Sequence, residues 1–243
     1  MSRGPIVPSL DPARIVETAR RLSQRVHERF PGRSLDAHVA RFADHAERVI
    51  ATGGKAMASP AWLQAAGWIG GFGAILLLAV PFWLAKRLEP PERLTDSLQA
   101  IDSAITIFAG TVAGYFTMRS ITQAYSRKRA LKGLQALRSF AHVADMLQTN
   151  KSPARLLFPT VATASSPMLE EDPVLVSRYL GYCAEFYALV AKVAVLYGDW
   201  VQDATVLSTV DDIEVLCSDF ENRVALKILQ LDRLVARMPP TAG

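Results

Sequence analysis

The stretch "ALRSFAHVADMLQTNKSP", residues 136–153, carries the clearest helical pattern of the chain and its clearest polar edge. Its apolar residues recur at helical spacing and make one arc, which consists of Leu137, Phe140, Ala144 and Leu147. Arg138, His142 and Asp145 fall within about 60 degrees of one another along the border of that arc, at about 100 degrees per residue. The stretch therefore predicts a helix that buries one face, carries titratable groups beside it and ends at Lys-Ser-Pro.

A second helix after the linker repeats this polar spacing. Arg178, Tyr182 and Glu185 stand at i, i+4 and i+7, as the first three residues do. The linker, residues 151–171, is long enough to turn the chain back, so we expect the two helices to be antiparallel neighbours. The expected contacts are Arg138 with Glu185, Asp145 with Arg178, and His142 with Tyr182.

Three interpretations of these six residues follow from their chemistry. A histidine beside a carboxylate can be a general base or can help to bind a metal ion. Ser139, Ser165 and Ser166 are the available hydroxyls, and none stands in a nucleophile-elbow context. We interpret the six residues as an interhelical clasp, with a ligand or regulatory site and a catalytic site as alternatives. The sequence has no CxxC or HExxH spacing, and we expect no cofactor and no metal.

Upstream, the chain is predicted to continue as one helix from an apolar segment at 98–118 to about residue 150. The part that follows the apolar segment, "RSITQAYSRKRALK" (119–132), carries five basic side chains and no acid. A basic stretch beside a membrane segment favours the anionic inner-leaflet surface, at roughly 1 kcal/mol per basic residue. We expect no nucleic-acid partner, because groove-binding motifs and interleaved aromatics are missing. The five residues are Arg119, Arg127, Lys128, Arg129 and Lys132.

Two segments predict a transmembrane hairpin. Residues 56–85 contain no charge, and 62–85, "WLQAAGWIGGFGAILLLAVPFWLA", is long enough to span a bilayer. The segment 98–118 carries only Asp102, which lies close to one end. Small residues at spacing four can bring the two helices, or two copies of the chain, close together. These residues are Gly67, Gly71, Gly110 and Gly114.

The distribution of charge predicts the orientation of the hairpin. Residues 1–61 carry ten basic residues, and 119–138 carry six basic residues without an acid. The link 86–102 has three basic and four acidic residues. Because basic residues mark the cytoplasmic side, both ends are predicted to be cytoplasmic. The expected parts are N-terminal helices at 1–55, a hairpin at 56–118 and a C-terminal helical domain at 119–243.

The remaining sequence predicts helices throughout. Asp11-Pro12 begins a helix that stops at Pro31-Gly32, and a second helix follows over 34–50. Asp172-Pro173 begins a helix to about residue 200, and Ser208 with Asp211 resembles a capping box for a last helix to about residue 237. Cys183 and Cys217 are expected to be buried free thiols. His38 and His45 share a face, where we expect them to be exposed.

The order "LRSFAHVADMLQTNKSP", "SSP", "RYLGYCAE" resembles the signature of a bacterial membrane-protein family without an assigned activity. The resemblance covers about residues 127–214 and implies membrane segments before the signature, but it implies no reaction. Leu147 stands where the family has a histidine, which weakens a metal site built on His142 and Asp145. The matching positions are Arg138, His142, Asp145, Gln148, Lys151, Arg178, Tyr179, Tyr182, Cys183 and Glu185.

The predicted fold class is all-α, with a two-helix transmembrane hairpin and a cytoplasmic bundle formed by the N- and C-terminal regions. Apolar residues make up 50% of the chain, which suggests that part of them face lipid, while the net charge of +4 is only mildly basic. We expect a bacterial inner-membrane protein with a non-enzymatic interaction or sensing module, as a homo-oligomer or with a protein partner. The alternatives are an enzyme or ligand-binding protein that uses His142 and Asp145, and an oligomeric channel or transporter component.

Overall fold

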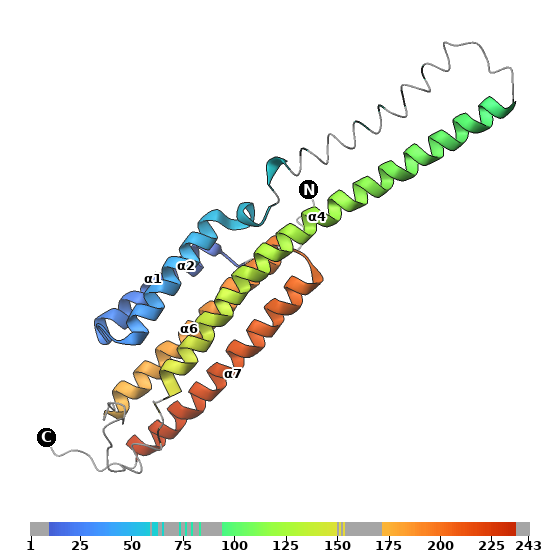
Figure 1. Cartoon of the computed structure of the whole chain (residues 1–243). Coiled ribbons are helices and arrows are strands. Elements are labelled where there is room, and N and C mark those ends of the chain that lie inside the picture. The colour runs from blue at the N-terminus through green and yellow to red at the C-terminus, as the bar shows by residue number, and fades with distance from the viewer. Residues whose placement is uncertain are drawn as a thin grey trace, which may run out of the picture. The chain divides into compact units, whose positions relative to one another are not determined.

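The computed structural model describes residues 10–58, 60–62, 65, 73, 76, 79, 83, 94–149, 151, 153 and 172–236. These residues are helical with short connections and contain no strand (Figure 1). The helices are α1 (Pro12–Arg29), α2 (Ser34–Met57), α4 (Leu94–Thr149), α6 (Pro173–Trp200) and α7 (Ala204–Val235). The all-α prediction is therefore confirmed.

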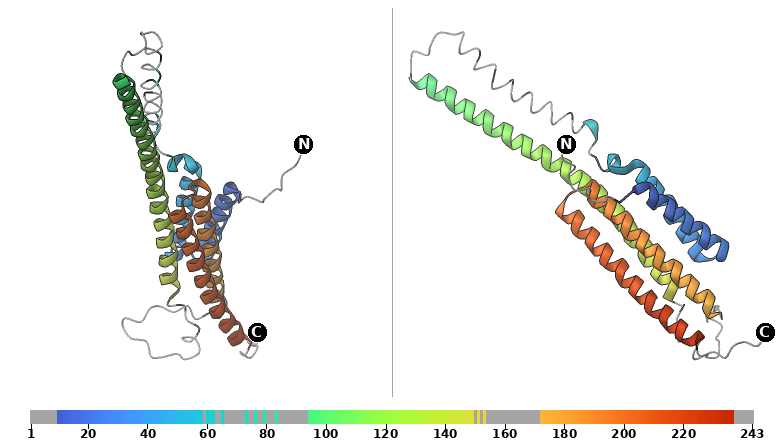
Figure 2. Two further views of the ribbon diagram at one scale, coloured as in Figure 1. Left: turned by 90° about the vertical axis from the view of Figure 1, so that its right-hand side faces the viewer. Right: turned by 180° about the vertical axis from the view of Figure 1, so that it is seen from behind.

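The chain divides into two compact units. One consists of Met1–Ala56 with Ala130–Gly243, and the other of Met57–Arg129. In the first unit, α1, α2, α6, α7 and the part of α4 from Ala130 onward lie side by side as a bundle (Figure 2). The N- and C-terminal regions thus fold together, as the sequence predicts.

Aspartate side chains cap three helices. The carboxylates of Asp11 and Asp172 accept hydrogen bonds from the backbone two residues on, each just before a proline in the first helical turn. Asp203 accepts from the amides of Thr205, at 3.0 Å, and Val206, at 3.4 Å, so α7 begins at Ala204. The predicted start at Ser208 is wrong, because a carboxylate one turn earlier already satisfies the first free amides.

α6 is the central helix of the bundle. Half of its 28 residues are buried, including Leu180, Phe186 and Tyr197. Phe186 packs edge-on against Phe42 of α2, with the ring centroids 4.9 Å apart. Cys183 and Cys217 are free and buried, as predicted. The apolar content of α6 is therefore explained by packing inside the bundle.

The side chain of His38 is buried, although the sequence predicted it to be exposed. It is only 3% exposed, and its Nε2 donates a hydrogen bond to the main-chain oxygen of Phe140, at 2.9 Å. His45 is half-buried beside the Phe140 ring. Burial lowers the pKa of both imidazoles, and Arg41 and Arg48 lower it further, while the bond to Phe140 opposes the effect at His38. The exposed placement was wrong because α2 packs against α4 as well as α6, which widens its buried face.

We expect the free energy of unfolding to fall as the pH is lowered from 7.5 to 5.5. Because the pKa of both histidines is lowered in the folded state, the unfolded chain takes up more protons as the pH falls through about 6.5. Each histidine therefore lowers the free energy of unfolding by at most about 1.4 kcal/mol per pH unit. Urea unfolding followed by circular dichroism measures this slope. His38→Gln can still donate to Phe140 but cannot titrate, and should make the slope shallower. Equal stability of the unsubstituted chain at both pH values would contradict the expectation.

The predicted hairpin lies only partly within the described residues. Of 62–85, the structure describes six residues, and Gly67 and Gly71 lie outside them. The segment 98–118 belongs to α4, and a β-carbon added at Gly110 or Gly114 would meet no described atom within 4 Å. Within the described part of the chain, one helix, α6, is apolar and long enough to cross a membrane, and 61% of that stretch is buried in the bundle.

Candidate functional site

α4 and α6 are neighbours, as Gly133 against the Tyr197 ring shows, but the residue contacts predicted between them are wrong. Glu185 makes a bidentate ion pair with Arg25 of α1, with Oε1 at 3.2 Å from Nη1 and a shorter contact at Oε2. Asp145 lies 3.8 Å from Nη2 of Arg223, on α7. The helical spacing located the polar edges correctly, but the edge of α6 faces α1 and the edge of α4 faces α7.

The predicted contact of His142 with Tyr182 is also wrong, because the two side chains face different helices. The His142 ring packs edge-on against Phe220 of α7, with centroids 5.6 Å apart. Tyr182 lies beside Phe30 at 6.2 Å and under the guanidinium of Arg25 at 5.8 Å. His142 thus contacts α7, and Tyr182 contacts residues of the N-terminal region instead of His142.

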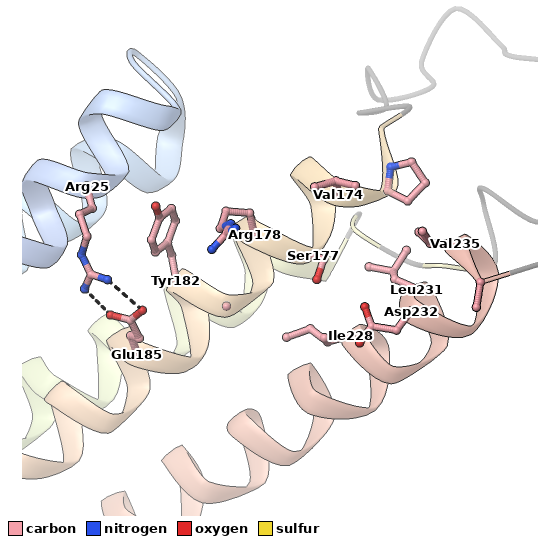
Figure 3. Close-up of a pocket in the computed structure, with 13 residues that line it drawn as sticks. Arg25, Val174, Ser177, Arg178, Tyr182, Glu185, Ile228, Leu231, Asp232 and Val235 are labelled. Carbon is pink, nitrogen blue, oxygen red and sulfur yellow. Dashed lines mark hydrogen bonds and ion pairs between the residues drawn. The ribbon is translucent and has the colours of Figure 1, made fainter. Parts of the chain in front are cut away.

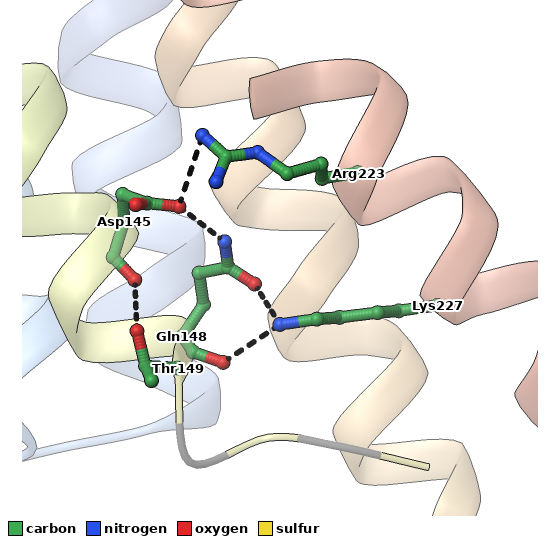
Figure 4. A network of polar contacts seen from close by, with 5 residues as sticks. All are labelled: Asp145, Gln148, Thr149, Arg223 and Lys227. Carbon is green, nitrogen blue, oxygen red and sulfur yellow. Dashed lines mark hydrogen bonds and ion pairs between the residues drawn. The ribbon is translucent and has the colours of Figure 1, made fainter. Parts of the chain in front are cut away.

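A polar network at the C-terminal end of α4 joins it to α7 (Figure 4). Gln148 is the centre of the network and is only 2% exposed. Its amide nitrogen donates to Asp145 Oδ1 at 2.7 Å. Lys227 of α7 donates to Gln148 Oε1 at 2.6 Å and to its main-chain oxygen at 3.2 Å. We call Asp145, Gln148, Arg223 and Lys227 the α4–α7 clasp.

The members of the clasp satisfy one another's hydrogen-bonding groups and charges. Lys227 satisfies a carbonyl at the end of α4, where a helix leaves its last carbonyls without internal partners. Burial lowers the pKa of Lys227, while the charge of Asp145 opposes this shift. The clasp holds one carboxylate and two cations, so a positive charge remains after the pairing. Arg223 also covers the Phe220 ring, with Cζ 4.5 Å from the centroid.

The thiol and the phenol beside the clasp are buried, which disfavours their reactive, deprotonated forms. Burial raises the pKa of Cys183 to about 12, so the thiol stays protonated at neutral pH. Burial also raises the pKa of Tyr187, whose hydroxyl has no hydrogen-bond partner among the described atoms. Lys151 lies over the Tyr179 ring at 5.3 Å. Five signature positions, Asp145, Gln148, Lys151, Tyr179 and Cys183, therefore gather around one structural joint.

The remaining predicted residues line two open grooves. Arg138 and His142 line a groove of about 380 Å³ between α4 and α7, together with Thr209 and Asp212. Arg178, Tyr182 and Glu185 line another of about 650 Å³ between α6 and α7, with Arg25 and Asp232 (Figure 3). The six residues thus belong to three places and do not form one cluster.

The chemistry of the first groove does not include an activated nucleophile. The hydroxyl of Ser139 donates to the main-chain oxygen of Gln135 at 3.0 Å, within its own helix. Among the described residues, no group of three or more His, Cys, Asp or Glu side chains is placed to hold a metal ion. The geometry supports a joint between helices better than a reaction centre.

Sequence reasoning missed Arg223 and Lys227. They stand four residues apart on α7, and both lie beside the apolar line of Phe220 and Val224. These two cations border an apolar stripe of α7, just as Arg138, His142 and Asp145 border the apolar arc of α4. This signal was present in the sequence, and charge complementarity with Asp145 would have favoured α7 as the partner of α4.

The basic side chains of the stretch 119–132 of α4 are all exposed, although Ala130 within it is buried. Arg119, Arg127, Lys128, Arg129 and Lys132 all have exposed side chains. The guanidinium of Arg129 lies over the Tyr125 ring, 5.4 Å from its centroid.

Comparison of the chain with known protein families, with curated proteins and with solved structures finds no match.

Proposed function

We propose that the chain is an integral protein of the bacterial inner membrane whose helical bundle acts as a cytoplasmic interaction or sensing module. One observation carries the membrane part of the proposal. Between residues 105 and 121 of α4, large apolar side chains are exposed, among them Ile105 at 62%, Phe108 at 60% and Phe116 at 60%. Together with Val112 and Tyr115 they fall within about 100 degrees of one another and make an apolar stripe along α4, which lipid or a neighbouring membrane helix would cover, while Ile121 lies on another side.

Two further features support the same proposal. Trp62 and Trp83 are exposed near the two ends of the first predicted span, where interfacial aromatics are common. The exposed cations that begin at Arg119 follow directly after the apolar segment, as expected for the cytoplasmic border of a span. The proposed arrangement is a hairpin with spans at 62–85 and 98–118 and both termini inside.

The interaction role is supported by the way polar side chains of the bundle pair with one another between helices. In the α4–α7 clasp, the polar groups of Asp145, Gln148 and Lys227 hydrogen-bond to one another and join the two helices. The Arg25–Glu185 pair does the same between α1 and α6. The signature residues of the resembled family thus serve as joints, and the outer faces of the helices remain for a partner.

We expect the chain to stay in the membrane fraction after extraction with alkaline carbonate. Green fluorescent protein fused after Gly243 should fluoresce, because it folds in the cytoplasm. Alkaline phosphatase inserted between Pro90 and Pro91 should be active, because it folds outside. Release by carbonate would contradict the membrane proposal. An active phosphatase after Gly243 would instead contradict the orientation.

A further inference from the structure

The groove between α4 and α7 is lined by polar side chains that the fold leaves unused. Gln135, Arg138 and His142 line it from α4, and at about 100 degrees per residue they fall within about 60 degrees of one another. Asp212 lines the opposite wall, from α7. No hydrogen bond or ion pair joins any of these four side chains to another described residue. We call the space between them the α4–α7 groove.

Opposite charges that meet elsewhere between helices of the bundle are paired. Arg25 of α1 and Glu185 of α6 form a bidentate pair, and the α4–α7 clasp also brings opposite charges together. Arg138 and Asp212 line one groove but form no ion pair among the described residues. Their charges are therefore available to a molecule that enters the groove.

The separation of these two charges follows from the register of the helices. α4 and α7 run parallel, because His142 contacts Phe220, and Gln148, farther along α4, contacts Lys227, farther along α7. Gln148 and Lys227 are 79 positions apart in the chain. At that offset Asp212 lies about one helical turn, or about 5.4 Å, before the level of Arg138. The cation and the anion thus stand at different levels of the same groove.

The floor of the α4–α7 groove is apolar. Leu134 and Ile213 are buried beneath it, and Leu131 is half-buried at its edge. The groove has a volume of about 380 Å³, which is enough for a small organic molecule. An apolar floor with a few polar groups around it is the usual composition of a small-molecule site.

The two charges select a ligand that carries both signs close together. A carboxylate can accept hydrogen bonds from the Arg138 guanidinium, with the Gln135 amide and the His142 ring as further donors. An ammonium group can donate to the Asp212 carboxylate. A simple anion would be repelled by Asp212, and a simple cation would be repelled by Arg138. An apolar side chain on the ligand would cover the floor.

We propose that the α4–α7 groove binds a free α-amino acid with an apolar side chain. This names a ligand class for the sensing module proposed above, and rests on that proposal only for the sensing role. α4 runs without interruption from Leu94 to Thr149. The ligand would therefore contact the same helix that contains the proposed span at 98–118.

Calorimetric titration of the full chain in detergent with L-leucine tests the proposal. L-leucine should bind with a Kd below about 1 mM. Isocaproate has the same carbon skeleton without the ammonium group, and isoamylamine has it without the carboxylate. Each should bind at least about tenfold more weakly, because each leaves one charge of the groove unpaired. No binding of L-leucine at millimolar concentration would overturn the proposal, and isocaproate binding as tightly as L-leucine would overturn the zwitterionic ligand.

Substitutions on the two walls locate the site. Arg138→Gln and Asp212→Asn should each weaken L-leucine binding by about tenfold or more, because each removes the partner of one ligand charge. Arg129→Gln on α4 and Asp211→Asn on α7 are matched controls, since both side chains are exposed and neither lines the groove. The controls should keep the affinity within about twofold. Urea unfolding shows that each variant is folded, and equal losses in wall and control variants would place the ligand elsewhere and overturn the proposal.

The ligand and the membrane proposal fail separately. If L-leucine does not bind while the chain resists carbonate extraction, the ligand proposal is wrong and the membrane proposal stands. If L-leucine binds and depends on Arg138 and Asp212, but carbonate releases the chain, the membrane proposal is wrong and the ligand proposal stands.

Discussion

Gly133→Ala is expected to destabilise the bundle by about 1–3 kcal/mol, although alanine is the better helix former. Gly133 lies on α4 against the ring of Tyr197 from α6. A β-carbon at this position would lie 2.5 Å from Cζ of Tyr197 and closer still to its hydroxyl. Tyr197 is only 1% exposed and also packs against Trp200, so its ring has little room to move. Urea unfolding in detergent, followed by circular dichroism, measures the loss.

A matched control lies on the neighbouring helix. A β-carbon at Gly181, inside α6, would meet nothing within 4 Å, so Gly181→Ala should stabilise the chain by up to about 1 kcal/mol. The penalty at Gly133 should also shrink in a Tyr197→Leu background, because the shorter side chain leaves space for the methyl group. If Gly133→Ala were as stable as Gly181→Ala, α4 and α6 could not be as close as the structure has them.

The sequence predicted the elements of this fold more closely than their contacts. Proline after aspartate located the starts of α1 and α6, because both residues favour the first turn of a helix. Apolar spacing located the buried faces, as at Leu22 and Val26 of α1. These features depend on residues close together in the chain, so a short window of sequence is enough to predict them.

Contacts between helices depend on which elements become neighbours. The spacing of Glu185 shows on which edge of α6 it stands, but four other helices, α1, α2, α4 and α7, pack against α6. Arg25, 160 positions away in the chain, proved to be its partner. The burial of Gln148 could not be predicted from the local sequence either. A glutamine is expected at the surface unless another helix supplies a hydrogen-bond partner, as Lys227 does here.

Gln148→Leu is expected to cost about 1–3 kcal/mol of stability, because it leaves polar groups of the α4–α7 clasp without partners. Asp145 loses the amide donor at 2.7 Å, and Lys227 loses the acceptor at 2.6 Å while remaining half-buried. Lys227→Met should cost a similar amount, since it leaves the buried Gln148 amide oxygen unsatisfied. Both values come from urea unfolding of the purified chain in detergent.

The double variant decides whether the clasp works as a unit. With leucine at 148 and methionine at 227, both polar partners are gone and two apolar side chains of similar size meet instead. The cost should then be clearly smaller than the sum of the two single costs. Lys192→Met is the matched control, because the one hydrogen bond that the described residues show for this exposed lysine goes to a carbonyl of its own helix, at 3.4 Å, and its charge acts on Glu221 of α7 without a direct ion pair. Its effect should stay within about 0.5 kcal/mol. Additive costs would mean that the two side chains act separately, and the joint between α4 and α7 would then have to rest on apolar packing alone.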